Sequence, residues 1–368
     1  MLYREFGKTG KKISALSMGG MRFPEPEKID EMAQIPVAAA EAGVNYFDTA
    51  PYYCNDQSET IMGAALAEIK RKGYSVYAGS KTNSKTYDGV WRDLEKTLKR
   101  LGRDTIDFYY LWCIITDDIF EERKQGGALK ALMEIREQGL ADHINVSSHQ
   151  DGDEIRDLVQ TGHFDGILLG YNILNFDYRE TGVHAAYEND LGVFIMNPLG
   201  GGLLTDSRNA ERFQKFKLSN DQSMLEASLH FLLLHKQITA ALVGFTSIED
   251  VQTAVKAVES FEQVKNTDLA AYKDRIREGF SSLCTGCRYC EYCPENIPVS
   301  KLMDTYNYWI LYQDKKQVRE RLKFHWNLGT DEAIELIERC TECGTCESKC
   351  TQKLPIIERL QELQSVLS

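Results

Sequence analysis

Residues 106–115 of this 368-residue chain read IDFYYLWCII, an apolar run with charged residues on its N-terminal side. A continuous apolar run of this length is typical of a strand that is buried on both faces. Such strands belong to parallel sheets whose two faces are covered by helices. The run ends in Trp112 and Cys113, and barrel enzymes hold their reactive side chains at the C-terminal ends of such strands.

The same pattern recurs seven times before residue 260. The other runs are ISALSMGG (13–20), NYFDTAPYY (45–53), YSVYAGSKT (74–82), DHINVSSH (142–149), DGILLGYN (165–172), GVFIMNPLG (192–200) and AALVGF (240–245). Amphipathic stretches at 32–43, 58–73, 88–102 and 129–140 lie between strand runs, and the last two carry a glycine after basic residues, which is a helix stop signal. Eight strands that alternate with helices predict a parallel (β/α)₈ TIM barrel over residues 1–260. A doubly wound open sheet is the alternative, but no GxGxxG follows the first strand.

The composition places the chain among ordinary soluble proteins, with 43% apolar and 27% charged residues. A net charge of −12 argues against nucleic acid and against anionic membrane surfaces as partners. The N-terminus, MLYREFGKTGKKI, lacks the apolar segment of a signal peptide, and no stretch approaches the roughly 20 apolar residues of a membrane span. These features predict a cytoplasmic protein.

Three residues with complementary chemistry fall at neighbouring strand ends. The second strand run supplies Asp48 and Tyr53, and the third supplies Lys81. A Lys ammonium near a Tyr hydroxyl lowers the pKa of the phenol and makes it a better proton donor or acceptor near neutrality. An Asp beside the Lys holds the ammonium charged and in place. We therefore expect these three side chains to form a proton-transfer site.

At these residues the chain resembles the aldo-keto reductase family. The resemblance rests on GKTGKKISALSMGG, NYFDTAPYY followed by SETIMG, SKT, NVSSH, NPLGGG and LVGFTSIEDV, in the family's order and spacing across residues 1–260. It implies a reductase that acts on a small-molecule substrate with hydride from a nicotinamide cofactor. It also implies a catalytic tetrad of Asp, Tyr, Lys and His, whose first three members fall on Asp48, Tyr53 and Lys81.

The fourth tetrad position departs from the family. A His should close the fourth strand five residues after an Asp, and that position, counted from Asp107, is Trp112. An indole has one N–H donor and no acceptor, and it does not titrate. It can still donate to an oxygen or offer a flat face to an aromatic or sugar substrate. The sequence leaves three possibilities open, which are altered chemistry, weakened carbonyl reduction, and a packing role in an inactive barrel.

The positions that bind the nicotinamide in the family are only partly kept. The Ser-Asn pair that holds the carboxamide aligns with Ser147 and Ser148. A Gln on the sixth strand aligns with Leu168, and the aromatic that stacks on the nicotinamide falls on Met196. Asp250 stands where NADPH-dependent members place an Arg for the 2′-phosphate. A carboxylate there repels a phosphate and can accept from a ribose 2′-hydroxyl, so NAD(H) is favoured over NADP(H) if a nicotinamide binds.

Eight of the ten cysteines crowd into two short motifs near the C-terminus, CTGCRYCEYCP and CTECGTCESKC. Three cysteines spaced two residues apart hold one [4Fe–4S] cluster, and a fourth, more distant cysteine ligates the other cluster of the pair. This rule predicts one cluster on Cys284, Cys287, Cys290 and Cys350, and a second on Cys293, Cys340, Cys343 and Cys346. Zinc is the alternative, but it prefers two CxxC pairs set well apart around one ion. The other two cysteines, Cys54 and Cys113, are expected to be small apolar fillers.

A subset of aldo-keto reductase relatives carries the same appended module, so the resemblance covers nearly the whole chain. It implies a helical linker at 261–283 and a small, mostly α ferredoxin-like two-cluster domain at 284–368. Three functions remain open. In the first, the protein is an NAD(H)-linked reductase of a carbonyl or an activated double bond. In the second, it is a reductase whose clusters deliver single electrons, from ferredoxin or another carrier, to a substrate in the barrel. The third is a non-catalytic redox-sensing or binding subunit.

Overall fold

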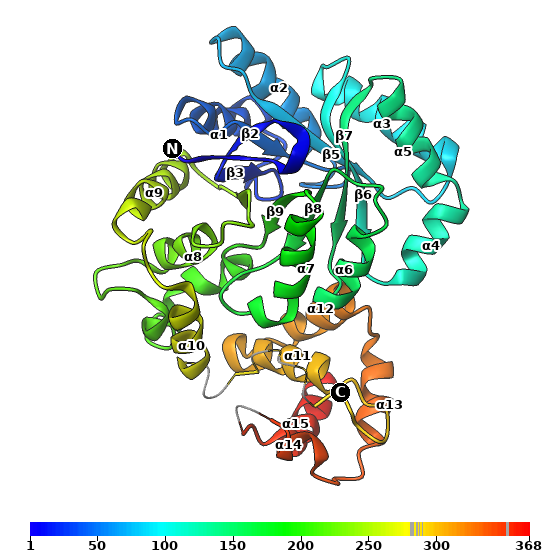
Figure 1. Ribbon diagram of the computed structural model, residues 1–368, viewed down its shortest axis with the longest axis vertical. Coiled ribbons are helices and arrows are strands. Elements are labelled where there is room, and N and C mark those ends of the chain that lie inside the picture. The colour runs from blue at the N-terminus through cyan, green and yellow to red at the C-terminus, as the bar shows by residue number, and fades with distance from the viewer. Residues whose placement is uncertain (280–282, 285, 287, 289, 351–352) are drawn as a thin grey trace.

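The computed structural model describes residues 1–279, 283–284, 286, 288, 290–350 and 353–368. Eight parallel strands close into a barrel, and a helical domain follows at one end of it (Figure 1). The barrel strands are β3 (Leu16–Gly19), β4 (Tyr46–Asp48), β5 (Tyr77–Thr82), β6 (Ile106–Ile114), β7 (Ala141–Ser148), β8 (Gly166–Gly170), β9 (Gly192–Met196) and β10 (Ala240–Val243). Each pairs with the next in chain order, and β10 closes the barrel on β3. The predicted TIM barrel is confirmed, and each strand lies within its expected run except that β7 begins one residue earlier, at Ala141.

Helices cover the outside of the barrel (Figure 1). They are α1 (Ile29–Glu41), α2 (Ser58–Arg71), α3 (Tyr87–Leu101), α4 (Asp117–Gln125), α5 (Ala128–Glu137), α6 (Gly152–Val159), α7 (Phe176–Glu188), α8 (Met224–Leu233) and α9 (Ile248–Glu259). Helix α3 illustrates how the sequence sets their ends. The hydroxyl of Thr86 accepts from the backbone N–H of Gly89 at its start, and Gly102 takes a left-handed φ of 63° at its end.

An N-terminal hairpin closes one end of the barrel. Strands β1 (Tyr3–Glu5) and β2 (Lys12–Ser14) pair antiparallel, and Phe6 between them is fully buried. The Phe6 ring packs against Phe108 and Phe194 inside the barrel, with centroids 5.0 and 4.5 Å away. A Cβ on Gly192 would lie 2.2 Å from this ring, so only glycine fits there. The N-terminal ends of the strands are thereby sealed, and the opposite ends carry the polar side chains.

The C-terminal part of the chain is helical. Its helices are α10 (Leu269–Gly279), α11 (Val299–Tyr312), α12 (Lys315–Trp326), α13 (Thr330–Glu338), α14 (Thr345–Ser348) and α15 (Ile356–Leu367). Helices α11, α12, α13 and α15 bury a core of their own that includes Leu302, Leu322 and Leu363. This arrangement agrees with the predicted small, mostly α domain. No helix in the described ranges is long and apolar enough to cross a membrane.

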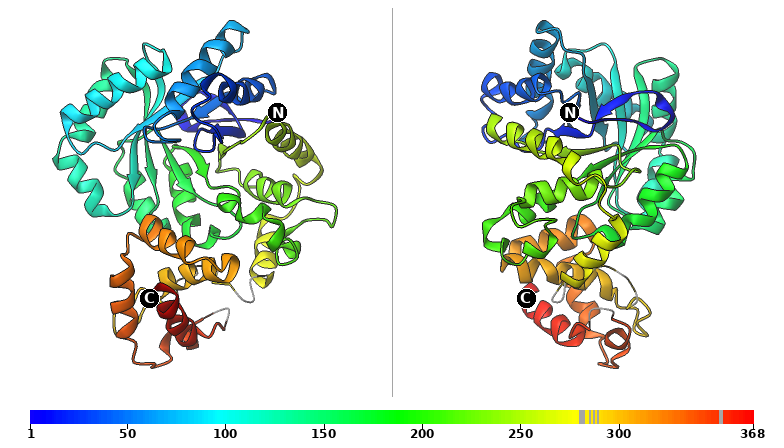
Figure 2. Two further views of the ribbon diagram at one scale, coloured as in Figure 1. Left: turned by 180° about the vertical axis from the view of Figure 1, so that it is seen from behind. Right: turned by 60° about the vertical axis from the view of Figure 1, so that its left-hand side comes forward.

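This helical domain lies at the end of the barrel where the strands have their C-terminal ends, next to α6 and α7 (Figures 1 and 2). Arg288 forms a 2.6 Å ion pair with Asp151, which caps α6 directly after β7. Tyr178 on α7 donates a 2.8 Å hydrogen bond to the carbonyl of Ser300 on α11. The imidazole of His149, just after β7, meets that of His325 on α12 with ring centroids 5.3 Å apart. The C-terminal ends of β7 and β8 are therefore joined to the appended domain.

Candidate functional site

Asp48 and Lys81 form a buried ion pair where β4 and β5 run side by side. Lys81 Nζ donates to Asp48 Oδ2 and, over 2.8 Å, to the carbonyl of Thr49. Both side chains are buried, at 1% and 4% exposure. Burial raises the pKa of Asp48 and lowers the pKa of Lys81, and the contact between the two charges opposes both shifts. The pair is therefore the charged centre that the strand ends predict.

Two tyrosines inside the barrel complete the surroundings of this pair. Tyr46 donates to Asp48 Oδ1 over 3.1 Å, and its oxygen lies 2.8 Å from the hydroxyl of Tyr110. The ring of Tyr110 lies 5.2 Å from Lys81 Nζ, so it shields the ammonium from one side. A Cβ on Gly79 would lie 2.2 Å from the Tyr46 hydroxyl, which requires glycine there. The sequence analysis predicted neither tyrosine. Tyr46 could have been predicted, because residues two apart on a strand point to the same face and Tyr46 lies two residues before Asp48.

Tyr53 lies next to the pair, but Lys81 acts on it differently from the prediction. Lys81 Nζ lies 5.5 Å from the centroid of the Tyr53 ring. Burial first, and then the charge of Asp48, raises the pKa of Tyr53, whereas the sequence predicted a lowered value. That prediction was wrong because desolvation outweighs an ammonium whose charge is already balanced by Asp48. The phenol is therefore protonated at neutral pH, and the raised pKa makes its proton harder to remove unless a nearby charge stabilises the tyrosinate.

Trp112 lies at an irregular point of β6 and faces the same tyrosine. The register between β6 and β7 shifts between Leu111 and Ile114, and Cys113 has a left-handed φ of 62°. Arg123 donates to the carbonyl of Trp112, and the N–H of Cys113 donates to Ser147 Oγ over 2.8 Å. The half-buried indole stands edge-to-face with Tyr53, with centroids 5.6 Å apart and an interplanar angle of 84°. Trp112 thus lies beside Tyr53 near the C-terminal end of β6.

The loop that carries Tyr53 has a strained backbone. Four non-glycine residues in it take left-handed φ values between 52° and 68°, namely Tyr52, Cys54, Asn55 and Asp56. Asp56 accepts from the N–H of Tyr52 over 3.1 Å and from Arg100 on α3 over 2.8 Å. Asn55 and Asp56 are only a weak sequence signal for such a loop, because Asn and Asp tolerate positive φ better than other residues but do not require it.

The predicted carboxamide-binding serines are bonded within the protein. Ser147 accepts from the N–H of Cys113, and Ser148 Oγ lies 3.1 Å from both Gln150 Oε1 and its backbone nitrogen. Both serines are buried, and the aligned Leu168 packs in the barrel interior. The structure therefore brings the serines to the catalytic end without leaving either hydroxyl unbonded.

Asp250 caps its own helix. It lies in the first turn of α9 and accepts from the N–H of Thr246 over 2.9 Å and from the N–H of Ser247 over 3.2 Å. Burial acts in the opposite direction, but these hydrogen bonds lower the pKa of Asp250, so the carboxylate is charged at neutral pH. Its side chain is exposed, as contact with a ribose would require.

A glycine loop and an unpredicted arginine adjoin these positions. Gly200, Gly201 and Gly202 all have positive φ, and a Cβ on Gly202 would meet nothing within 4 Å. Arg22 Nη2 would lie 4.0 Å from a Cβ on Gly201, and the side chain of Arg22 is exposed. The N–H groups of Gly200 and Gly202 donate to the carbonyls of Asn197 and Leu199 over 2.9 and 3.1 Å, so the loop offers a phosphate close approach to the backbone beside the cation of Arg22.

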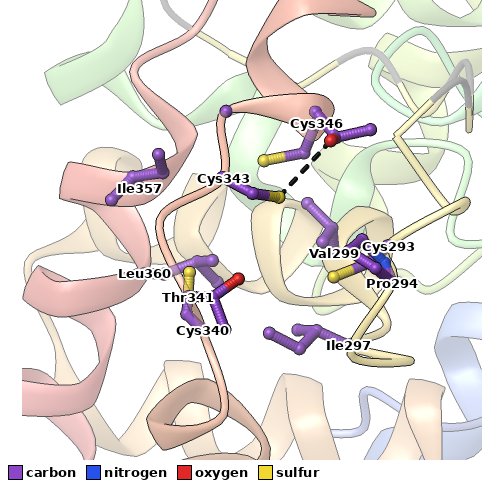
Figure 3. A pocket seen from close by; sticks show the side chains of 12 residues that line it. Cys293, Pro294, Ile297, Val299, Cys340, Thr341, Cys343, Cys346, Ile357 and Leu360 are labelled. Atoms are coloured by element: carbon purple, nitrogen blue, oxygen red, sulfur yellow. Dashed lines mark hydrogen bonds between the residues drawn. The ribbon is translucent and has the colours of Figure 1, made fainter.

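Four of the predicted cluster ligands line one pocket. Cys293, Cys340, Cys343 and Cys346 surround it together with apolar side chains such as Ile297 and Leu360 (Figure 3). A hydrogen bond with Thr345 lowers the pKa of Cys343, and burial raises the pKa of Cys346 to about 11. Within the described ranges, no three His, Cys, Asp or Glu side chains converge closely enough to hold one metal ion. The four thiols therefore line one space, as the predicted ligand set requires.

The other predicted ligand set is described only in part, because Cys287 lies outside the described residues. Cys284 and Cys290 are buried, and Cys350 is half-buried and accepts from the N–H of Leu354 over 3.4 Å. Cys284 Sγ lies 4.0 Å from the hydroxyl of Tyr178, a barrel residue. This ligand set therefore adjoins the barrel, whereas Cys343 in the other set is exposed.

Comparison with known proteins agrees with this geometry. The model of the Aldo/keto reductase family matches residues 15–274. The chain belongs to the aldo/keto reductase family. The model of a 4Fe-4S dicluster domain matches residues 283–354, which supports iron–sulfur clusters in the helical domain. The protein is therefore an oxidoreductase of the aldo-keto reductase type with an appended 4Fe-4S domain, and the predicted resemblance is confirmed.

Its relatives are distant. L-galactose dehydrogenase of Arabidopsis thaliana is 26% identical over 298 residues, which cover 71% of this chain and 89% of that protein. L-glyceraldehyde 3-phosphate reductase of Escherichia coli (strain K12) is 23% identical over 329 residues, which cover 76% and 93%. An aldo-keto reductase structure from Bacillus halodurans, in its holo form, is 21% identical with a TM-score of 0.64 and covers 76% and 96%. At this identity the structural likeness establishes the fold alone.

Proposed function

We propose that the protein reduces a carbonyl or an activated double bond, with Tyr53 as the proton donor and Trp112 in the place of the family's His. The observation that supports this most directly is the buried Asp48–Lys81 ion pair beside the Tyr53 ring. An ion pair withdrawn from water is costly to maintain unless it is fully bonded, and here Thr49 and Tyr46 supply the additional hydrogen bonds.

In this mechanism the chain's own residues transfer one proton to the substrate and stabilise the anion that the transfer leaves behind. The phenol of Tyr53 gives its proton to the substrate oxygen, or to the carbon that becomes saturated. The tyrosinate left behind gains from the nearby ammonium of Lys81, which Asp48 and Thr49 hold in place. Trp112 limits access of water to Tyr53 and presents a flat apolar surface to the substrate.

In this function a bound nicotinamide would supply both electrons of the reduction as hydride, and the iron–sulfur clusters would be structural or would face a redox partner. A nicotinamide supplies hydride when bound, and Gly200–Gly202, Arg22 and Asp250 are the residues that would hold its phosphates and ribose. Iron–sulfur clusters transfer single electrons, and the two predicted cysteine sets would hold them. We include NADH as the expected nicotinamide because of the charged carboxylate of Asp250.

A second candidate function has support from the contact between Tyr178 and Cys284. Cys284 Sγ lies 4.0 Å from the hydroxyl of Tyr178 on α7, so a cluster held by Cys284 would adjoin the barrel. Electrons from ferredoxin or another carrier would enter at the exposed Cys343 set and pass by way of the Cys284 set to a substrate in the barrel. Tyr53 and Lys81 would then supply protons only.

Anaerobic titration distinguishes the two candidates. Purified protein is titrated with NADH, with NADPH and with reduced ferredoxin, while nicotinamide binding and the absorbance of the clusters are followed. Tight NADH binding with carbonyl-dependent NADH oxidation supports the first function. Bleaching by reduced ferredoxin, without nicotinamide binding, supports the second and contradicts the first. No response to any of the three reagents contradicts both.

A further inference from the structure

We propose that the substrate is a flat, conjugated carbonyl compound that stacks on the aromatic pair formed by Trp112 and Tyr52. This inference rests on the proposed reductase function and specifies its substrate class. The rings of Tyr52 and Trp112 are nearly parallel, with centroids 6.4 Å apart and an interplanar angle of 15°. Aromatic rings in this orientation attract a further flat ring beyond what burial of area alone provides.

Tyr52 has an energetically unfavourable backbone conformation in this position. Its φ is 68°, a left-handed value that a non-glycine residue rarely adopts, and its side chain is 61% exposed. Large side chains with this backbone persist only where their surroundings fix them, and such strain gathers at ligand sites. Here Asp56 fixes Tyr52 by accepting from its N–H, and Arg100 fixes Asp56.

The stack also adjoins the proton donor. The ring of Tyr53 contacts the same indole edge-to-face at 5.6 Å, so a molecule stacked on Trp112 lies beside Tyr53. A carbonyl conjugated with the stacked ring shares its plane, because conjugation keeps the two coplanar. The flat ring and the reacting oxygen are then positioned by one contact surface.

The groups around the indole favour an aromatic compound over a sugar. A sugar needs several polar partners for its hydroxyl groups, and burying an unpaired one is costly. Tyr52 and Tyr53, the rings that contact the indole, offer two hydroxyls and no charge. Two charged side chains near these rings are already engaged, since Lys81 is bonded to Asp48 and Arg123 donates to the carbonyl of Trp112.

Binding of two matched ketones tests the inference. Acetophenone and cyclohexyl methyl ketone have the same carbon skeleton, but only acetophenone is flat and conjugated. Calorimetric titration of the full chain should show acetophenone binding roughly three- to tenfold more tightly. The ratio of the two affinities should fall close to one in Trp112→Leu, and it should be smaller than in wild type in Tyr52→Ala. Tyr187→Ala, which removes another exposed tyrosine at 45% exposure on α7, should keep it.

The outcomes separate this inference from the proposed function. Equal affinity for the two ketones, tighter binding of glyceraldehyde than of acetophenone, or a preference that survives Trp112→Leu would overturn the stacking inference. Binding requires no turnover, so Tyr53→Phe should keep the aromatic preference. If wild-type protein shows the preference but no NADH-dependent turnover of any carbonyl, the reductase proposal fails while the stacking surface stands.

Discussion

Arg100 on α3 holds Asp56 through both of its terminal nitrogens, and Asp56 in turn accepts from the backbone of Tyr52. One helix on the outside of the barrel thereby fixes the loop that presents Tyr53. Left-handed φ values cost roughly 1–2 kcal/mol for each ordinary residue, and Tyr52 and Cys54 of this loop have them. The Asp56–Arg100 contact offsets part of that cost.

Asp56→Asn should loosen this loop without changing its backbone preference. Asn tolerates positive φ and can still accept from Tyr52, but it loses the charge that pairs with Arg100. We expect a loss of about 1 kcal/mol in stability, because the pair is partly exposed, and a several-fold lower kcat. Thermal unfolding and steady-state kinetics measure the two effects. Lys96→Met should change neither, since Lys96 reaches Asp56 only at 3.4 Å on the surface.

The pH dependence of this contact has a defined direction. The hydrogen bond with Arg100 lowers the pKa of Asp56 below its unfolded value of about 3.9. The stability that the pair contributes is therefore fully present above about pH 4 and is lost as the pH falls toward the folded pKa. The difference in Tm between wild type and Asp56→Asn should stay constant from pH 5 to 8. A difference that changes within that range would show that another group controls the loop.

The cysteine pattern predicts close to eight irons per chain in anaerobically prepared protein. Cys346→Ser should lose about four of them, because Cys346 lines a pocket with three other predicted ligands. Cys54→Ser is the matched control and should keep the full iron content. Iron and zinc are measured together by elemental analysis, and stoichiometric zinc in place of iron would contradict the cluster assignment.

Asp250 predicts a preference for NADH over NADPH of roughly tenfold, on the order of 1.4 kcal/mol. Asp250→Asn should narrow this preference and keep the helix cap, because an amide oxygen can still accept from Thr246 and Ser247. Glu249→Gln removes a neighbouring exposed charge and should leave the preference unchanged. Fluorescence titration with both nucleotides measures it. Equal or tighter binding of NADPH by wild type would show that another residue binds the 2′-phosphate. Arg22 is the first candidate for that role.

The sequence predicted the features that depend on local patterns. Apolar runs placed the eight strands, and strand ends placed Asp48 and Lys81, because parallel strands bring their C-terminal ends together. The cysteine spacing likewise predicted that Cys293 joins Cys340, Cys343 and Cys346, and these four line one pocket.

Features that depend on packing were not predictable in this way. The raised pKa of Tyr53 comes first from burial, which depends on Trp112 and on a loop whose left-handed residues have no strong sequence signal. The contact between Tyr178 and Cys284 joins residues 106 positions apart. Asp250 was interpreted only as a ribose ligand, although the Ser-x-x-Asp spacing from Ser247 also fits a helix cap.

The last prediction concerns the replacement of the family's His by Trp112. Tyr53→Phe should lower turnover by 10²- to 10⁴-fold, since it removes a positioned general acid. Trp112→His should instead raise the reduction of small aldehydes above the wild-type level, provided that NADH binds, because an imidazole can donate to the substrate carbonyl. It should also lower the reduction of aromatic ketones, since the smaller ring stacks over less area.

Steady-state kinetics with propionaldehyde and acetophenone measure this exchange. The ratio of the two kcat/KM values should shift toward propionaldehyde in Trp112→His, and Trp91→His on α3 should leave it unchanged. Because the indole contacts Tyr53 at 5.6 Å, the exchange should also alter the pH profile, through a group that titrates near 6.5. If both activities and the pH profile match wild type, Trp112 is a packing residue, and altered chemistry at this position is excluded.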